Sequence, residues 1–489
     1  MDSFFASIAV LSDFLWGGTW GEIRILPMGV VTITLLGTGV YFMVRLRLRP
    51  LRRLRPAFAA LWGGRQGQGA GQITPWQALS TALSGQIGTG NLAGVATAIT
   101  LGGPGAVFWM WVTAILGMAV AFAESSLAVR YRVRYPDGRL HGGPMYYIRD
   151  GLGRHWRWLA VLFCVGTLVS ALVTGNMIQA NSVAQSMVEV GHSIGVVLPT
   201  WGVGLVIACL AFLVIVGGIN SIGTIAGRLV PVMALGYVAA ALVVLVLHPG
   251  HVGDAIALIF RSAFGLEQAA GGVAGYGVLA AIRAGVARAL FSTEAGQGSA
   301  PIAHAAAKTD SPVRQGEIAM VGVFIDTIVV CTMTALVILA VEGSYPSGGG
   351  TATVSYAWQS TDLHASAITT AAFAQGVAGG QWIVLAAQFL FAFTTIIGWS
   401  YYGEQAARYL FGPRTAAVWR YLWIVFVFLG AWVSQVEGLW LLGDVANTTM
   451  LVPNVIAILA LSGVVIAMAR EADTPGSRPA DAGEPVRTQ

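Results

Sequence analysis

Two short glycine-containing stretches hold the residues of this chain best suited to binding chemistry. Residues 87–91 read IGTGN and residues 295–299 read AGQGS, and each lies near the middle of a long apolar run. Glycine lacks a Cβ and tolerates backbone conformations that interrupt a helix. An interrupted helix exposes amide N–H and carbonyl groups, which suit the carboxylate of an amino acid and a cation such as Na⁺. The spacing therefore predicts a site for a small zwitterion beside a cation.

Side chains around the two stretches are candidate ligands for the zwitterion, in a pocket too small for leucine. Asn176 and Gln179 lie three residues apart on one helical face, so they either face the cavity or bond neighbouring helices. Trp399 either forms a wall of the pocket or packs in the core. The expected substrate-binding residues are Gln86, Gly88, Thr89, Gly90, Phe291, Gly296, Asn176, Gln179 and Trp399.

The elements that position these residues are predicted to be membrane-spanning helices. The chain has 489 residues, of which 56% are hydrophobic and 10% are charged, whereas a soluble domain carries roughly 25% charged residues. Apolar runs of roughly 20 residues have the length needed to cross a bilayer as a helix. About eleven such spans are expected, at 27–46, 76–99, 105–130, 157–188, 200–217, 224–247, 277–305, 317–341, 379–411, 416–434 and 439–469.

The distribution of positive charge gives these spans an orientation. Of the 27 Lys and Arg residues, seven lie in 45–65, seven in 130–157 and three in 408–420, and six more lie on connections of the same side. This asymmetry follows the positive-inside rule and predicts an outside N-terminus, a cytoplasmic C-terminus and a bacterial-type inner membrane. The net charge of +5 therefore indicates membrane topology and not a nucleic-acid partner.

The positions of the two glycine pairs indicate an internal repeat. When the first span is set aside, the pairs fall in core helices one and six of ten, which run in opposite directions. Two five-helix halves of opposite orientation, each opened by a broken helix, are typical of inverted-repeat transporters. The expected segments are an interfacial segment 1–26, an additional span 27–46, a basic cytoplasmic loop 47–75, repeats 76–247 and 277–469, and a disordered cytoplasmic tail 470–489.

Two other interpretations of the glycines were weighed. Gly90, Gly94 and Ala98 recur every four residues, which is also a pattern of close helix packing. That pattern explains neither the polar neighbours nor the second glycine pair. A dinucleotide-binding loop would need a strand and a helix around the glycines, and these glycines lie within a span.

Charged residues inside the spans are candidates for a gate, an ion pair or a proton relay. Glu294 and Asp326 lie deep in the membrane, where a carboxylate is costly, and Arg288 is a candidate partner for one of them. Asp444 begins core helix ten on the outer side, and Arg283 and Arg288 begin core helix six on the same side. These residues either form an extracellular gate or simply lie at the interface. Glu124 lies near the cytoplasmic end of its span, so a solvated role or loop pairing is expected.

Several segments also resemble the alanine or glycine:cation symporter family. GTGNLAGVATAITLGGPGAVFWMW (88–111) resembles its signature, and RALFSTEAGQGSAPIAHAAAKTDSPVRQG (288–316) resembles a second family block. The resemblance extends over nearly the whole chain and implies a leucine-transporter-like fold with uptake of small neutral amino acids together with a cation, usually Na⁺. The chain departs from the family at Thr293, where Asn is usual, and this position is included among the expected substrate contacts.

A wider resemblance, to sodium-coupled neurotransmitter transporters, suggests the cation ligands. Gly88-Thr89-Gly90-Asn91 and Phe291-Ser292 resemble the helix breaks of those proteins, and Thr394-Thr395 resembles a hydroxyl pair that holds Na⁺. Hard oxygen donors suit Na⁺. The expected sodium ligands are Asn91, Ser292, Thr394 and Thr395.

The sequence thus predicts an all-α polytopic symporter that carries alanine or glycine inward with Na⁺ by alternating access. The alternatives are proton coupling through Glu294 or Asp326, a channel, and a membrane-embedded enzyme, for which no nucleophile–base pair or metal cluster is apparent. No organic cofactor and no obligate protein partner are expected beyond the substrate and the bilayer. The preference among alanine, glycine and serine, the stoichiometry and the oligomeric state stay open.

Overall fold

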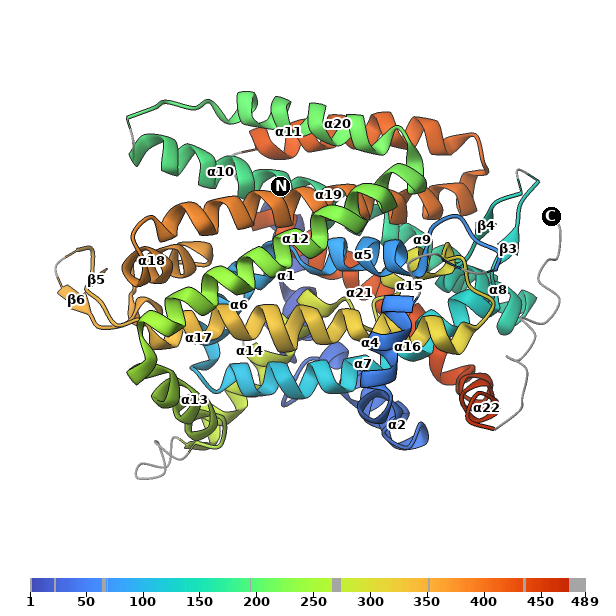
Figure 1. The fold of residues 1–489 in the computed structure, drawn as a ribbon, viewed down its shortest axis with the longest axis horizontal. Helices are drawn as coiled ribbons and strands as arrows, with labels where there is room; N and C mark the ends of the chain where they lie inside the picture. The colour runs from blue at the N-terminus through green and yellow to red at the C-terminus, as the bar shows by residue number, and fades with distance from the viewer. Residues whose placement is uncertain are drawn as a thin grey trace.

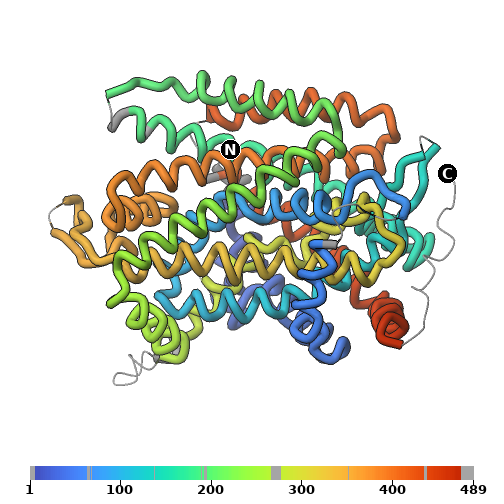
Figure 2. Tube along the Cα trace, in the orientation of Figure 1, coloured from blue at the N-terminus to red at the C-terminus, as the bar shows by residue number. Residues whose placement is uncertain are grey.

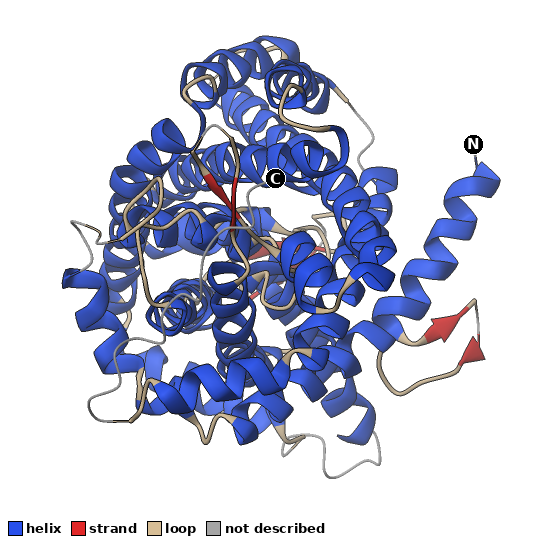
Figure 3. Cartoon of the chain, turned by 90° about the vertical axis from the view of Figure 1, so that its right-hand side faces the viewer, coloured by secondary structure: helices blue, strands red, loops and turns tan. Residues whose placement is uncertain are grey.

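The structure, a computed structural model, describes residues 2–21, 23–63, 67, 69–136, 138–193, 195–265, 274–350, 352–433 and 437–474. Nearly all of the described chain is helical, and the longer helices lie side by side with their axes roughly aligned (Figure 1). Figure 3 shows these helices almost end-on, with the N-terminal helix and a short hairpin at the edge of the bundle.

Seven helical segments of the described chain have the length and apolar composition needed to cross a membrane. Each falls on one of the predicted spans, and two of them contain a π-helical turn. The segments are α7 (Ala106–Arg130), α9–η4–α10 (Arg157–Leu172, Val173–Met177, Ile178–Ser193), α12 (Gly218–Leu247), α16–η5–α17 (Pro312–Val323, Phe324–Cys331, Thr332–Ala340), α19 (Gly380–Phe411), α20 (Thr415–Trp432) and α21 (Glu437–Ala460).

Two further predicted spans are interrupted helices, which confirms the breaks expected at the glycine pairs. The first consists of α5 (Pro75–Gln86), η2 (Thr89–Asn91) and α6 (Ala93–Gly102), and the second of α14 (Ala274–Thr293) and α15 (Ala300–Ala305). A capping box begins α5: the Gln77 N–H donates to Thr74 Oγ1, and the Thr74 N–H donates to Gln77 Oε1. In Figure 2 the two interrupted helices, blue and yellow, lie in the middle of the molecule.

The remaining predicted segments need several corrections. The predicted spans 27–46 and 200–217 correspond to the shorter helices α2 (Val30–Arg45) and α11 (Thr200–Ile215). The span predicted at 439–469 is two helices, because α21 ends at Ala460 and α22 (Ser462–Glu471) begins after Leu461. The segment expected as a basic loop contains α3 (Arg49–Arg52) and α4 (Leu54–Gly63). Of the tail predicted to be disordered, residues 475–489 lie outside the described residues.

Short elements connect and flank these helices. The N-terminal segment forms α1 (Asp2–Ser12) and η1 (Asp13–Gly17), as a helix was expected there. Three antiparallel hairpins pair β1 (Thr19–Trp20) with β2 (Ile23–Arg24), β3 (Val133–Arg134) with β4 (Leu140–His141), and β5 (Tyr345–Ser347) with β6 (Ala352–Val354). The other connecting helices are α8 (Pro144–Gly151), η3 (Arg154–Trp156), α13 (Pro249–Ala263), η6 (Ala357–Gln359) and α18 (Ser366–Gly376).

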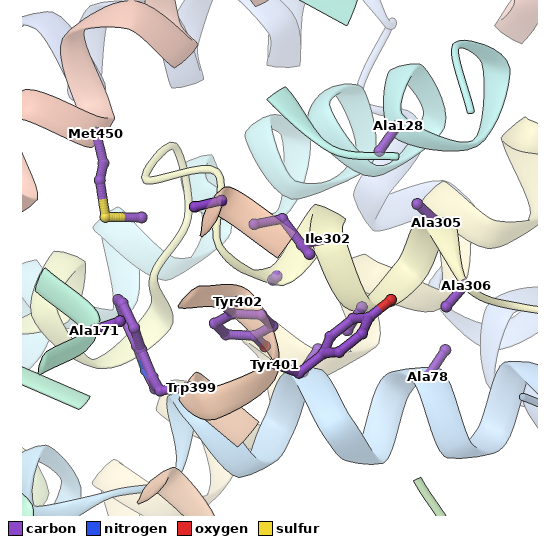
Figure 4. Close-up of a cluster of buried hydrophobic side chains, with 14 of the residues drawn as sticks. Ala78, Ala128, Ala171, Ile302, Ala305, Ala306, Trp399, Tyr401, Tyr402 and Met450 are labelled. Carbon is purple, nitrogen blue, oxygen red and sulfur yellow. The ribbon is translucent and has the colours of Figure 1, made fainter. Parts of the chain in front are cut away.

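An apolar core fixes α19 next to the helix breaks. Figure 4 shows Trp399, Tyr401 and Tyr402 of α19 among buried side chains that include Ala171 of α9 and Met450 of α21. The Trp399 and Tyr402 rings meet edge to face, with their centroids 5.5 Å apart. Because these large side chains are buried in close-packed surroundings, α19 presents a rigid face to the site described next.

Candidate binding site at the two helix breaks

The first break is held open by hydrogen bonds that replace those of a continuous helix. After α5 ends, Ile87 and Gly88 are extended, and the Gly88 N–H donates to Asn91 Oδ1 at 2.9 Å. The Thr89 N–H donates to Gln179 Oε1 on α10 at 3.5 Å. These side chains satisfy backbone groups that would be costly to leave unpaired in a membrane, so the break is a stable feature of the fold.

The second break depends on left-handed backbone conformations. Gly296 and Gly298 both have φ of 84°, which glycine adopts without penalty. Glu294 also lies in the left-handed region, with φ of 53°, which is uncommon for a residue with a side chain. Such backbone strain is typical of functional sites. Gln86 Nε2 donates to the Thr293 carbonyl at 2.8 Å and thereby joins the two breaks.

A small cavity lies between the breaks. Its free volume is about 20 Å³, which is room for roughly one water molecule. The cavity accepts a larger molecule only if side chains move, so its size favours a small substrate. The lining residues come from both breaks and from α10, η4, α19 and α21: Gly85, Gln86, Gly88, Gly90, Thr174, Gln179, Phe291, Glu294, Gln297, Thr395, Trp399 and Asn447.

Glu294 presents a carboxylate to this cavity. Its Oε1 accepts a hydrogen bond from Trp399 Nε1 at 2.7 Å, and its Oε2 accepts one from Ser299 Oγ at 2.6 Å. Arg288, the partner considered from sequence, is not bonded to Glu294, and no Lys or Arg of the described chain forms an ion pair with it. A buried carboxylate without a basic partner attracts a cationic group.

Asp326 forms a second polar cluster against the first break. It lies in the π-helical segment η5, and such segments often occur at functional sites. Asp326 Oδ1 accepts a hydrogen bond from Asn91 Nδ2 at 2.6 Å, and Ser292 Oγ lies 2.9 Å from Oδ2. Thr327 Oγ1 donates to Oδ2 at 2.7 Å. The structure therefore brings two of the four expected sodium ligands, Asn91 and Ser292, onto one carboxylate.

The two hydroxyls expected as a pair on α19 have different surroundings. Thr395 lines the cavity, and a Cβ placed on Gly88 would lie 2.8 Å from its Oγ1. Thr394 instead donates to the Phe391 carbonyl at 3.0 Å and lies 3.6 Å from Met233 Sδ of α12. Thr395 Oγ1 donates to the same Phe391 carbonyl at 2.9 Å, so the two hydroxyls share one partner, but only Thr395 is among the residues that line the cavity.

Among the expected substrate residues, six line the cavity and four do not. The six are Gln86, Gly88, Gly90, Phe291, Gln179 and Trp399. Asn176 instead donates to the Trp423 carbonyl of α20 at 2.9 Å. Of the two roles expected for Asn176, the structure therefore shows the hydrogen bond to a neighbouring helix. A Cβ on Gly296 would lie 2.3 Å from Leu35 Cδ2 of α2, so Gly296 faces that helix. Thr293 and Thr89 are buried at the breaks outside the cavity lining.

Two buried hydroxyls at the site have no partner among the described residues. Thr174 Oγ1 belongs to the cavity lining, and Thr89 Oγ1 lies in the first break. Buried polar atoms are nearly always hydrogen-bonded in proteins. These two hydroxyls are therefore available to a polar ligand.

Sequence analysis missed several lining residues. Thr174, Gln297 and Asn447 were not among the candidates, although Gln297 stands between the two glycines of the second pair. Asn447 Oδ1 accepts hydrogen bonds from Gln297 Nε2 and from Ser170 Oγ. The polar run around Asn447 in an otherwise apolar helix was the available signal.

Glu124 was expected to be solvated or to pair with a loop, and the structure instead buries it against α21 and the second break. Its side chain is fully buried in α7, where Oε2 accepts from Asn454 Nδ2 at 2.8 Å. The Gly296 N–H lies 3.4 Å from Oε1, and Asn454 Nδ2 also donates to the Gly296 carbonyl. Residue position along a span indicates depth but not the neighbouring helices, and here the second break covers the end of α7.

At one end of the cavity, aromatic and charged residues lie between α14 and α21. The Phe291 and Trp440 rings are 5.7 Å apart between centroids. Arg288 and Asp444 interact electrostatically but form no ion pair among the described contacts. Asp444 Oδ2 instead accepts from Ser12 Oγ at 3.4 Å, and Arg283 donates to the Pro27 carbonyl.

At the other end, backbone hydrogen bonds join the start of the first broken helix to the end of the second. Ile73 pairs with Ala307 in a parallel bridge, and the Lys308 N–H donates to the Ile73 carbonyl at 2.7 Å. Arg132 donates to the carbonyls of Ala70, Ala307 and Thr309. Burial lowers the pKa of Arg132, and the Asp310 charge offsets part of this effect. These contacts join the two broken helices at this end.

A bundle of apolar membrane-length helices, with two interrupted helices around one small polar cavity, defines a secondary transporter of the leucine-transporter-like fold. The protein is a transporter and not an enzyme. The chain belongs to the sodium:alanine symporter family, which matches residues 19–475.

Comparisons with known proteins agree with this assignment. The chain is 41% identical over 468 residues to the sodium/alanine symporter AgcS of Methanococcus maripaludis, covering 95% of this chain and 96% of that protein. It is 42% identical over 462 residues to an uncharacterized transporter of Haemophilus influenzae, covering 94% of each. Its fold is similar to the crystal structure of MhsT in complex with L-phenylalanine, with a TM-score of 0.57, 14% identity, and 84% of this chain and 94% of that chain covered.

Proposed function

We propose that this transporter carries alanine or glycine into the cell together with Na⁺. The observation that carries the proposal is the small cavity between the two breaks, with the Glu294 carboxylate and the unpaired Thr174 hydroxyl on its walls. The family assignment and the name of the Methanococcus relative support the same substrate class and ion.

The substrate would bind through its two charged ends. Glu294 faces the ammonium group, because it supplies a buried negative charge fixed by Trp399 and Ser299. The substrate carboxylate is met by the unpaired hydroxyl of Thr174 on the cavity wall and by that of Thr89 in the adjoining first break. Phe291 lies close to Gly90, where an added Cβ would be 3.3 Å from Phe291 Cδ1. Once side chains have moved to admit the substrate, this approach should limit the substrate's own side chain to hydrogen or methyl and exclude leucine.

Na⁺ would bind at Asp326, Asn91 and Ser292. The Asp326 carboxylate supplies the charge, and the Ser292 hydroxyl supplies a hard oxygen donor of the kind that Na⁺ prefers. Asn91 presents Nδ2 to Asp326 while its Oδ1 accepts from the Gly88 N–H, so it would contribute an oxygen only after its amide turns. A bare carboxylate in the membrane core is unfavourable, and a bound cation removes that cost. Asn91 also accepts from the Gly88 N–H, so ion binding would set the shape of the first break that contacts the substrate. Thr395 is the remaining candidate ligand.

The orientation and repeat follow from the charge pattern and the breaks. The end of the molecule with α8, the β3–β4 hairpin and α22 (right in Figure 1) carries most of the basic residues and is assigned to the cytoplasm. The two five-helix halves would move against each other around the cavity. One positive charge that enters across 100 mV supplies about 2.3 kcal/mol, which supports about 50-fold accumulation of substrate.

The decisive experiment is uptake of radiolabelled alanine into proteoliposomes of the purified protein. An imposed inward Na⁺ gradient at constant pH should drive uptake above equilibrium, and unlabelled glycine should compete with alanine whereas leucine should not. A proton gradient of the same magnitude without Na⁺ is the matched comparison. Uptake driven equally well by the proton gradient would establish the rival, proton-coupled mechanism, and equilibration without accumulation would establish a channel.

A further inference from the structure

A basic cleft lies at the end of the molecule assigned to the cytoplasm, apart from the substrate cavity. It is formed where α2 ends, along α3 and beside α22, and its volume is about 640 Å³. Six arginines and one acidic residue are among the residues that line it: Arg45, Arg47, Arg49, Arg52, Arg53, Arg470 and Asp473.

The ion pairs of the cleft leave most of its positive charge without a partner. Arg49 is buried and pairs with Glu317 of α16 at 2.8 Å and with Asp473 at 2.7 Å. Arg53 pairs with the same Asp473 at 2.6 Å. These contacts hold the wall of the cleft together. The four exposed arginines, which form no ion pair with any described residue, are Arg45, Arg47, Arg52 and Arg470.

A sharp turn gathers these arginines around one space. Arg47 and Leu48 have φ of 53° and 58°, in the left-handed region that side-chain-bearing residues rarely adopt. The Leu48 N–H donates to the Met43 carbonyl at 2.9 Å, which ends α2 and reverses the chain into α3. The positive-inside rule explains why arginines lie on this side of the membrane, but it does not explain why four unpaired guanidinium groups face one cleft.

Exposed aliphatic side chains stand beside the arginines. Val44, Leu48 and Leu51 are 66%, 49% and 47% exposed. In a membrane protein such a surface contacts acyl chains, and the cleft therefore offers charge and apolar surface at the level where a lipid has its headgroup and its tails.

We propose that the cleft binds the phosphate of an anionic phospholipid, with the headgroup among Arg45, Arg47 and Arg52 and the acyl chains along Val44, Leu48 and Leu51. Guanidinium groups bind phosphate oxygens through paired, charge-assisted hydrogen bonds. The bound lipid would connect α2 and α3 to α22. The proposal is independent of the substrate and of the ion that drives transport.

The test uses the purified full chain in detergent and native mass spectrometry with added phosphatidylglycerol or phosphatidylcholine. The wild type should bind phosphatidylglycerol more tightly than phosphatidylcholine. The triple variant R45Q/R47Q/R52Q should bind phosphatidylglycerol at least about tenfold more weakly, since each basic residue near an anionic lipid contributes appreciably. The matched control is R134Q/R154Q/R157Q, which removes three exposed arginines from the other basic segment, 130–157.

Each other outcome overturns the proposal. Equal loss of lipid in the control and the triple variant would show general attraction to a basic surface. Unchanged binding of phosphatidylglycerol by R45Q/R47Q/R52Q would show that the cleft is not the site. Thermal unfolding of all three proteins verifies that they are folded. In a parallel arm, inorganic phosphate that competes with the lipid at equal concentration would identify a free-phosphate site instead of a lipid site.

Discussion

Trp399 donates a hydrogen bond of 2.7 Å to Glu294, and this contact connects α19 to the break in the second interrupted helix. It fixes a strained residue, because Glu294 has a left-handed backbone while its side chain lines the cavity. Gly175 packs so closely on Trp399 that an added Cβ would lie 2.4 Å from Cγ, so the indole has one position. The carboxylate is therefore held in place before any substrate arrives.

Replacement of Glu294 by Gln should reduce alanine binding by roughly 10- to 100-fold, because a charge-assisted hydrogen bond contributes about 1.5–3 kcal/mol. The shape and the contacts with Trp399 and Ser299 are largely kept. Calorimetric alanine binding by the purified variant is the measurement. Glu342→Gln, at a residue outside the cavity lining, is the control. Wild-type affinity in Glu294→Gln would remove Glu294 from the site.

Replacement of Asp326 by Asn should raise the Na⁺ concentration for half-maximal uptake by at least about tenfold, since the carboxylate supplies the only negative charge of that cluster among the described residues. Thr395→Val should raise it less, and Thr394→Val, whose hydroxyl faces Met233, should leave it unchanged. Uptake measured against Na⁺ concentration checks all three. A larger effect of Thr394→Val than of Thr395→Val would contradict this arrangement.

The glycines of the breaks should respond differently to Ala. A Cβ on Gly88 would lie 2.8 Å from Thr395 Oγ1, and one on Gly90 would lie 3.3 Å from Phe291 Cδ1. Gly88→Ala should therefore abolish alanine binding, and Gly90→Ala should weaken it. Gly94→Ala, with its nearest atom at 4.0 Å, should bind normally. Binding and thermal unfolding are measured together, and normal binding by Gly88→Ala would exclude a cavity of this shape.

Gly296→Ala should lower stability and is a poor test of binding alone. Its φ of 84° and the 2.3 Å approach of a Cβ to Leu35 both oppose a side chain. A loss of about 1–3 kcal/mol is expected from backbone strain, measured as an earlier unfolding transition in detergent. An unfolding temperature equal to that of Gly94→Ala would contradict the packing described here.

Glu124 should tolerate Gln better than Leu. Gln keeps an oxygen to accept from Asn454 Nδ2 and removes a buried charge that has no basic partner in the described structure, so stability should stay within about 1 kcal/mol or rise. Leu removes the acceptor and should cost about 1–3 kcal/mol. Denaturation of both variants in the same detergent compares them. Equal stability of the two would show that the Asn454 contact is unimportant.

The extracellular gate stays a prediction, and it now involves Asp444 and Arg288 but not Arg283. Asp444→Asn should impair transport more than alanine binding, and a double-mutant cycle should show coupling of Asp444 to Arg288, which it faces electrostatically. Arg283 should show no coupling, because it donates to the Pro27 carbonyl. The swap Arg288→Asp with Asp444→Arg should recover part of the activity. A cycle without coupling for either arginine would remove the gate.

Much of the architecture was predictable because it depends on local composition. Membrane-length apolar runs fix the helices, since backbone groups in hydrocarbon must bond within their own segment. The glycine pairs at 88–90 and 296–298 fixed the breaks, and the polar residues beside them marked Gln86, Phe291 and Asn91 as candidates. The end of α21 at Ala460 was missed, although Ser462 and Gly463 interrupt the run there, because apolar residues continue on both sides of them.

The sequence by itself determined the class of fold, the two breaks and the presence of buried carboxylates in the spans. Tertiary structure alone decided which residues share a site. Asn176 and Gln179 lie on one helical face, yet the first bonds the Trp423 carbonyl of α20 and the second reaches the first break. Likewise, Asp326 meets Asn91 and Ser292, and Glu124 meets Gly296, through contacts between segments separated by more than thirty residues. Helical periodicity specifies a direction relative to the helix axis, whereas the partner in that direction depends on how the other helices pack.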